Sequence, residues 1–161
     1  MILVKIKEIL SYVIIILVVI LIRTFIVTPI RVNGDSMNDT LKDGYLMILK
    51  KYEKYSIDRF DIVVINLDGD KLIKRVVGLP KEDIAYIDGK LYINEELVDN
   101  SYGYGETKDF KDYCAEGEYF VLGDNRGNSK DSRIFGCVSE KNIMGTTNFV
   151  FFPFDKIGKV S

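Results

Sequence analysis

The feature that most constrains this chain is an uncharged apolar run near its amino terminus. Residues 9–22 read ILSYVIIILVVILI, and accepting Arg23 extends the run over residues 9–27, roughly 28 Å of helix. Arg23 lies near one end, where its long side chain can reach the lipid headgroups. A cleaved signal peptide would need small residues at −3 and −1 of a cleavage site, and residues 24–29 contain no such Ala-x-Ala-like site. A buried helix of a soluble domain would keep a polar face, which this uniformly apolar run lacks. We therefore predict a transmembrane anchor over residues 9–27, preceded by a short tail over residues 1–8.

Residues 28–161 have the pattern of a mostly β domain. Short runs rich in β-branched and aromatic residues alternate with turn residues, and no long amphipathic helix competes. The expected strands are Leu46–Leu49, Ile62–Asn66, Leu72–Val77, Ile84–Ile87, Leu91–Ile93, Tyr119–Leu122 and Thr147–Phe152. Asp88-Gly89 is typical of a tight hairpin, whereas the polar, glycine-bearing residues 100–117 predict a mobile loop or small insertion. We predict one antiparallel, barrel-like β domain behind the anchor.

The residue types exclude several functions. The chain carries 22 basic and 24 acidic side chains, a balance that does not attract nucleic acid. It contains no histidine, and Cys114 and Cys137 lack the close spacing of a zinc site, so neither a metal nor another cofactor is expected. The two cysteines form either a disulfide or two buried thiols. Without histidine, a nucleophilic serine needs another base.

Ser36 and Lys74 are the candidates for that chemistry. Ser36 follows Gly34-Asp35 after an extended apolar segment, where a tight turn would expose its hydroxyl and its backbone N–H. An ordinary turn serine that caps its own backbone is the alternative. Strand alternation over residues 72–77 places Lys74 between two apolar neighbours on one face, where burial would lower its pKa and leave a neutral amine. A lysine on a solvated sheet face is the alternative for this position.

A third cluster is the loop over residues 123–133, which reads GDNRGNSKDSR. It holds more Asp, Asn, Ser and Arg than a turn requires, and such a set favours hydrogen-bonded ion pairs that keep a site rigid. A polar surface loop with a few weak salt bridges is the alternative.

In this order, the clusters resemble the conserved boxes of type I signal peptidases, the membrane-bound serine proteases of the Ser/Lys class. The resemblance runs through Arg23-Thr24-Phe25, Gly34-Asp35-Ser36-Met37, Lys74-Arg75-Val76-Val77-Gly78 and the loop over residues 123–133. It implies the family's β fold, with Ser36 as the nucleophile and Lys74 as the general base. As supports it implies Ser129 hydrogen-bonded to the Lys74 amine, Asp124 paired with Arg75, and Asp131 paired with Arg133.

The resemblance also implies how a substrate binds. An extended peptide would lie as an extra strand along residues 30–33 and 72–74. The apolar residues that would form shallow pockets for small side chains at −1 and −3, or else pack in the core, are Ile30, Val32, Leu41, Leu72 and Ile73. The Ser36 N–H would be one oxyanion donor. The second donor stays open, because Gly34 stands where some members have a serine.

Four residues depart from the family's usual pattern. Asp39 stands where proline is usual, Phe60 stands where glycine is usual, and Lys81-Glu82 replaces the common Gly-Asp. None of these changes removes a reacting group. Asp39 adds charge and flexibility near the nucleophile, which favours a reduced catalytic efficiency.

The combined prediction is an anchored endopeptidase on the extracytoplasmic side of the cell membrane, removing signal peptides from exported preproteins. Its partners are those preproteins and the lipid bilayer. A first rival is a membrane-tethered β module that binds signal-peptide-like segments without cleaving them. A second is a self-cleaving repressor-type Ser/Lys domain, which would need an internal Ala-Gly site that this chain lacks.

Overall fold

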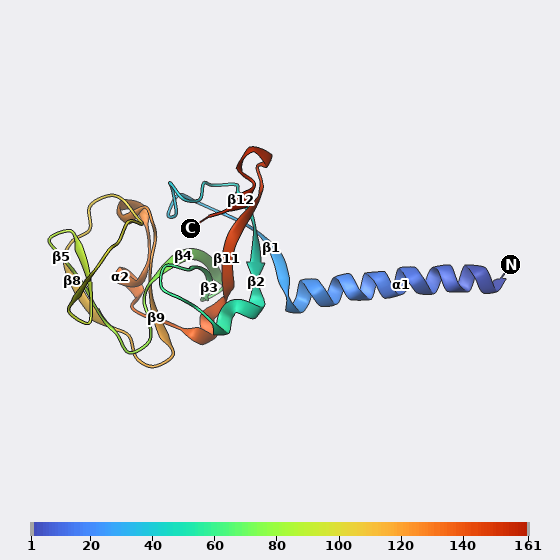
Figure 1. Cartoon of the computed structure of the whole chain (residues 1–161), viewed down its shortest axis with the longest axis horizontal. Helices are drawn as coiled ribbons and strands as arrows, with labels where there is room; N and C mark the ends of the chain where they lie inside the picture. The colour runs from blue at the N-terminus through green and yellow to red at the C-terminus, as the bar shows by residue number, and fades with distance from the viewer. Residues whose placement is uncertain (1, 161) are drawn as a thin grey trace.

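A long helix, α1 (Ile2–Phe25), projects from a β domain in the computed structural model, which describes residues 2–160 (Figure 1). Met1 and Ser161, the outer ends of the predicted tail and β domain, lie outside the described residues. The helix forms over a segment without glycine or proline, the two residues that interrupt helices most strongly. It already begins at Ile2, so the residues predicted as a separate tail are part of the helix.

Helix α1 ends earlier than the predicted anchor. Ile26 is in a turn and Val27 begins strand β1, so neither is helical. The uncharged stretch of residues 9–22 corresponds to about 21 Å of helix, whereas a bilayer core is about 30 Å thick. Within residues 2–160, no helix is both long enough and apolar enough to cross a membrane. The predicted transmembrane anchor over residues 9–27 is therefore not supported.

The larger sheet follows the order β1-β2-β11-β3-β4-β9-β10, with β12 paired to β11. Its strands are β1 (Val27–Arg31), β2 (Leu46–Lys50), β3 (Ile62–Leu67), β4 (Asp70–Gly78), β9 (Glu118–Leu122), β10 (Val138–Ser139), β11 (Ile143–Phe152) and β12 (Gly158–Lys159). All of these pairs are antiparallel, which confirms the predicted sheet type. Register shifts along β11 mark bulges, which bend a strand and increase its twist. Among the described strands, β1 and β10 end the path, so the sheet does not close into a barrel.

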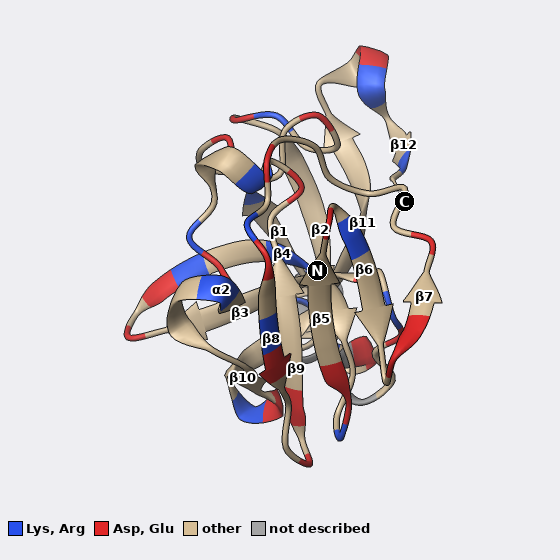
Figure 2. Ribbon diagram, turned by 90° about the vertical axis from the view of Figure 1, so that its left-hand side faces the viewer, with Lys and Arg blue, Asp and Glu red and all other residues tan. Residues whose placement is uncertain are grey.

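The smaller sheet has the order β7-β6-β5-β8. Its strands are β5 (Asp83–Ile87), β6 (Lys90–Ile93), β7 (Glu96–Val98) and β8 (Phe110–Tyr113), and Figure 2 shows both charge signs along β8. Asp88 and Gly89 have φ values of 50° and 77° between β5 and β6, which confirms the predicted hairpin. The segment predicted as a mobile loop or small insertion, residues 100–117, contains strand β8. Strand β8 lies there because its backbone pairs with β5 and the Phe110 ring stacks on Phe120.

The remaining elements are short helical turns that connect strands. They are η1 (Lys51–Tyr55), η2 (Arg126–Asn128), α2 (Ser132–Phe135), η3 (Glu140–Asn142) and η4 (Phe154–Lys156). Asp131 precedes α2, and its side chain accepts a hydrogen bond from the Arg133 N–H, as N-cap residues do.

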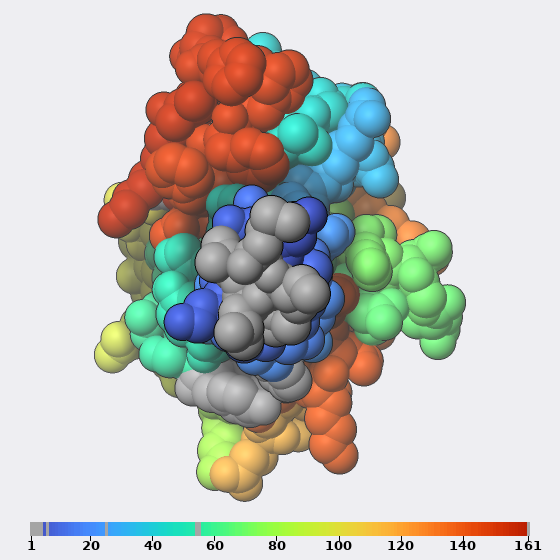
Figure 3. All heavy atoms as spheres, turned by 90° about the vertical axis from the view of Figure 1, so that its right-hand side faces the viewer, coloured from blue at the N-terminus to red at the C-terminus, as the bar shows by residue number. Residues whose placement is uncertain are grey.

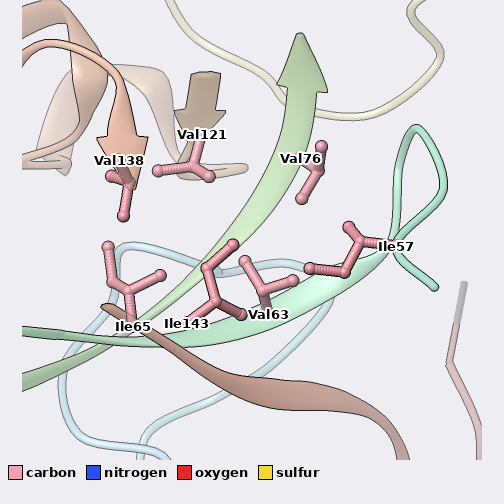
Figure 4. Packing of buried hydrophobic residues seen from close by; sticks show 7 residues of the cluster. All are labelled: Ile57, Val63, Ile65, Val76, Val121, Val138 and Ile143. Carbon is pink, nitrogen blue, oxygen red and sulfur yellow. The ribbon is translucent and has the colours of Figure 1, made fainter. Parts of the chain in front are cut away.

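Three clusters of buried apolar side chains hold the sheets together. One lies under β3, β4, β9, β10 and β11 and consists of Ile57, Val63, Ile65, Val76, Val121, Val138 and Ile143 (Figure 4). A second lies between the two sheets and includes Val77, Ile84 and Phe120. The third includes Met37 and Leu41, which are both fully buried. Burial of these side chains in the third cluster holds the segment that follows β1 against the sheet.

Cys114 and Cys137 form a disulfide, a pairing that the sequence left open. It joins the end of β8 to the segment before β10, across 23 residues of chain. A crosslink of this loop length restricts the unfolded chain, so its removal is expected to cost about 3 kcal/mol of unfolding free energy.

Urea unfolding of the chain in detergent, with and without a thiol reductant, measures this contribution. The Cys114→Ala/Cys137→Ala variant is the control, because it should match the reduced protein and ignore the reductant. Equal unfolding midpoints for the oxidised and reduced chain would contradict the expected contribution.

Candidate active site

Ser36 lies in a turn between β1 and β2. Two backbone hydrogen bonds close this turn: the Val32 N–H donates to the Tyr45 carbonyl, and the Gly44 N–H donates to the Val32 carbonyl. Gly34 has a φ of 84°, a conformation that favours glycine, and its N–H donates to Asp43 Oδ1 at 2.8 Å. The segment that begins at Ser36 therefore has a defined path, while the Ser36 side chain stays partly exposed.

Lys74 lies in β4, opposite Val63 of β3. Its Nζ donates a hydrogen bond to Ser36 Oγ at 2.6 Å, and the residue is only 2% exposed. Val76, on the same face, belongs to the first core cluster, and Leu72 packs against that cluster. The structure thus brings the two predicted reacting groups into direct contact, in the apolar surroundings that strand alternation predicts.

Burial lowers the pKa of Lys74 to about 8. The carboxylates of Asp131 and Asp124 raise this pKa and so oppose the effect of burial, whereas the Arg133 charge lowers it further. Among the described residues, none makes a salt bridge to Lys74. A substantial fraction of the amine is therefore neutral near pH 8 and can accept the Ser36 proton.

Activity should follow the titration of this amine. We expect kcat/KM to rise about tenfold per pH unit below pH 8 and to level off above it, because only neutral Lys74 acts as a base. The measurement is kcat/KM on a peptide substrate from pH 5 to 10, with Lys141→Gln as an exposed control that should keep the same profile. A rate independent of pH across this range would remove Lys74 as the base.

Arg75 and Asp124 form a buried, bidentate ion pair beside the Ser36–Lys74 contact. Arg75 Nε and Nη2 donate to the two Asp124 oxygens at 2.9 and 2.8 Å, and the side chains are 1% and 3% exposed. Thr40 Oγ1 also donates to Asp124 Oδ2, at 2.6 Å. Because Thr40 follows Ser36 in the same loop, Asp124 connects that loop to β4.

The second predicted pair, Asp131 with Arg133, is also present. Arg133 Nε and Nη2 donate to the Asp131 oxygens, each at 2.8 Å, and the Gly123 N–H donates to Asp131 Oδ2 at 3.0 Å. Burial raises the pKa of Asp131, but the hydrogen bonds from Arg133 and Gly123 outweigh it and hold the pKa below its usual value. Asp131 therefore remains ionised and fixes the loop from Gly123 onward.

Ser129 does not make the predicted hydrogen bond to the Lys74 amine. Its hydroxyl lies near the Asp131 carboxylate, yet among the described residues Ser129 Oγ is buried without a hydrogen-bond partner. The reason is local packing. Gly123 has no side chain, and the Ser129 side chain occupies the space where a Cβ would lie, together with the Ser36 carbonyl. Lys74 Nζ is directed to Ser36 Oγ instead.

The five predicted substrate-contacting residues separate into two groups. Ile30 and Ile73 line a cavity of about 410 Å³ between β1 and β4, together with Pro29 and Met144. Val32 and Leu41 belong to the third core cluster and are 2% and 0% exposed, so they have almost no surface to offer a substrate. Leu72 is partly buried against the first cluster. Alternation along β4 separates it from Ile73.

Sequence reasoning missed Tyr102, whose ring lies over the buried ion pair. The Arg75 guanidinium is 4.0 Å from the centre of this ring, and the Phe60 ring packs against it with centroids 5.0 Å apart. Phe60 has a φ of 72°, which explains why glycine is usual at this position. Its contact with Tyr102 offsets part of that backbone strain. The departure from the family pattern at Phe60 was the signal for a compensating partner.

Lys81-Glu82, another departure, has a similar explanation. Lys81 has a φ of 66°, again a conformation that favours glycine. Glu82 accepts hydrogen bonds from Arg59 at 2.7 and 2.9 Å and from the Leu79 N–H at 2.6 Å. The hydrogen bonds to Glu82 stabilise the turn in which Lys81 adopts this strained backbone conformation.

Known proteins resemble this chain. The family described as "Signal peptidase, peptidase S26" matches residues 5–152. The chain belongs to this family of signal peptidases. Signal peptidase I T of Bacillus subtilis (strain 168) is 40% identical over 91% of this chain and 85% of its own. Signal peptidase IB of Staphylococcus aureus (strain COL) is 33% identical over 93% of each chain.

A solved structure is similar as well. The crystal structure of a signal peptidase I from Enterococcus faecalis V583 aligns with a TM-score of 0.52 and 36% identity, over 56% of this chain and 96% of that chain. The signal peptidase described here is thus a serine endopeptidase, a hydrolase, and its mostly β architecture is that of signal peptidase I.

Proposed function

We propose that this enzyme cleaves amino-terminal signal peptides from preproteins by acyl transfer to Ser36, with Lys74 as the general base. The observation that carries the proposal is the 2.6 Å contact between Lys74 Nζ and Ser36 Oγ at a buried amine. The neutral amine takes the Ser36 proton as Oγ attacks the scissile carbonyl. The ammonium then protonates the leaving amine, and Lys74 activates the water that hydrolyses the ester. No metal or cofactor takes part in this scheme.

The substrate binds as an added β-strand between β1 and β4. Among the described strands, β1 lies at the edge of the sheet and pairs with β2, and β4 pairs with β9 from Arg75 onward. Backbone groups on these two edges can therefore pair with an extended peptide, as in β-augmentation. Ile30 and Ile73 line the cavity between the edges, which supports a preference for small side chains at −1 and −3.

Cleavage of a precursor whose signal peptide carries alanine at −1 and −3 tests the proposal. The native chain in detergent should cut after the −1 residue, as read from the mass of the released mature protein. Phenylalanine at −1 should block the cut, whereas phenylalanine at −2, which would face away from the cavity, should be tolerated. An uncut precursor would instead favour the β module that binds signal-peptide-like segments without cleaving them.

We also propose that α1 attaches the enzyme to a membrane, with the β domain on the extracytoplasmic side. Large apolar and aromatic side chains between Ile9 and Ile22 are 42–67% exposed. Figure 3 looks along α1 toward the β domain, and the helix stands clear of that domain over most of its length in Figure 1. Apolar side chains on all sides of an isolated helix are suited to lipid rather than water.

Flotation with phospholipid vesicles tests the attachment. The full chain should float with the vesicles, and Ile15→Glu/Val19→Glu should abolish flotation because two charges enter the apolar helix. Ile134→Glu is the matched control, since this exposed side chain lies in the β domain. Equal flotation of all three proteins, or of none, would contradict attachment through α1.

A further inference from the structure

The peptide bond that joins Asp35 to Ser36 is held from its carbonyl side. The Asp35 carbonyl accepts a hydrogen bond from the Asn38 N–H at 3.1 Å and a second from Asn125 Nδ2 at 3.2 Å. This peptide is trans, so its N–H, which belongs to Ser36, points away from the carbonyl. Among the described residues, no acceptor is recorded for the Ser36 N–H. The Ser36 N–H is therefore an oriented and unused donor beside the nucleophile.

Asn125 holds the next peptide unit too. Its backbone N–H donates to the Ser36 carbonyl at 3.0 Å, so main chain and side chain together contact both residues of the nucleophile turn. Gly123, two residues earlier, lies so close to the Ser36 carbonyl that a Cβ would collide with it. The turn and the loop over residues 123–125 are therefore packed directly against each other.

Asn125 itself is fixed from its other side by Tyr104. The Tyr104 N–H donates to the Asp124 carbonyl at 2.8 Å, and the Arg126 N–H donates to the Tyr104 carbonyl at 2.9 Å. These two bonds form a short parallel bridge around Asn125. The Asp124 side chain is held separately by Arg75. Asn125 consequently connects a rigid support to the turn that carries Ser36.

We propose that Asn125 is a positioning residue that orients the Ser36 N–H as an oxyanion-hole donor. This inference rests on the acyl-transfer function proposed above. When Ser36 Oγ attacks, the scissile carbonyl oxygen becomes negative, and a donor that is already oriented stabilises this charge without reorganisation. Asn125 contributes by holding the opposite end of the same peptide unit. Without its amide, only the Asn38 N–H holds the Asp35 carbonyl, and the Ser36 N–H loses its fixed direction.

Kinetics of Asn125→Ala and Asn125→Leu test the role. The leucine variant keeps about the size and the backbone N–H of Asn125 and removes the Nδ2 donor without adding a charge. For both variants we expect kcat to fall about 10- to 100-fold, since direct loss of an oxyanion donor costs about 100- to 1,000-fold. KM should stay within about twofold, and the pH profile should remain that of Lys74. Affinity for a peptide boronic acid, which forms a tetrahedral adduct with serine, should fall by the same factor as kcat.

Binding of an uncleavable peptide separates this role from a merely structural one. Its affinity for Ser36→Ala and for Ser36→Ala/Asn125→Leu should be equal, because the ground state makes no oxyanion. Asn142→Ala, an exposed asparagine of η3, should match the native enzyme in every readout. Unchanged kcat and boronate affinity in both Asn125 variants, or a loss confined to KM, would overturn the inference while leaving the proposed function intact. A native chain that neither cleaves nor binds the boronate would overturn both.

Discussion

Ser36→Ala and Lys74→Met are each expected to lower kcat by about 1,000-fold or more in the precursor assay. Each removes one member of a nucleophile–base pair, and such members act as a unit. Methionine conserves most of the buried lysine volume and removes only the amine, so folding should be retained. Circular dichroism and the unfolding midpoint check that the variants are folded. Cleavage by Ser36→Ala at the native rate would show that another residue is the nucleophile.

Ser132→Ala is the matched control for this experiment. Ser132 is buried, and its Oγ accepts a hydrogen bond from the Val121 N–H at 2.9 Å. The hydroxyl therefore has a structural partner rather than access to a substrate. The variant should lose some stability, because a buried N–H is left unpaired, yet it should retain kcat below its unfolding temperature.

Asp124→Ala is expected to lower the free energy of unfolding by about 3–5 kcal/mol. The substitution leaves the Arg75 guanidinium buried without a counter-charge, and this residual charge, more than the lost attraction, sets the cost. Urea unfolding in detergent measures the difference. The double variant Arg75→Met/Asp124→Leu should recover much of it, because an apolar pair of similar volume leaves no charge behind.

A surface ion pair provides the control for Asp124. Lys81 and Glu116 lie 3.0 Å apart, but their side chains are 59% and 82% exposed. Glu116→Ala should therefore cost less than about 1 kcal/mol. If Asp124→Ala cost no more than Glu116→Ala, the buried pair would not be the support that its geometry indicates.

The features that sequence predicted are those encoded by local pattern. Alternation over residues 72–77 placed Lys74 in apolar surroundings, and Asp88-Gly89 marked a turn whose φ values are positive at both residues. The composition of the loop over residues 123–133 favoured ion pairs, and the Asp131–Arg133 pair lies within it. Each of these depends on neighbours within a few residues, which a sequence shows directly. The Arg75–Asp124 pair joins residues 49 positions apart, and only the resemblance to the family implied it.

The features that sequence missed depend on distant partners. Residues 26–27 were predicted as helix because apolar β-branched residues suit either structure, but Ile26 forms a turn and pairing with β2 places Val27 in strand β1. Residues 110–113 lie within a polar, glycine-bearing segment, and pairing with the neighbouring strand β5 makes them a strand. Tyr102 and Asn125 contact Arg75 and Asp35 only because the chain returns to the same place. The unusual residue at Phe60 indicates that a compensating partner exists, but no local pattern identifies Tyr102 or Asn125 as the residue that makes the contact.

Covalent labelling tests the Ser36–Lys74 mechanism most directly. The full chain in detergent is treated at pH 8 with a serine-directed acylating inhibitor, and the modified peptide is identified by mass spectrometry. The predicted result is one label per chain on Ser36, with little label in Lys74→Met because the base is missing. Label on Ser129 or Ser132, or equal labelling of Ser36 in Lys74→Met, would contradict a mechanism in which Lys74 activates Ser36.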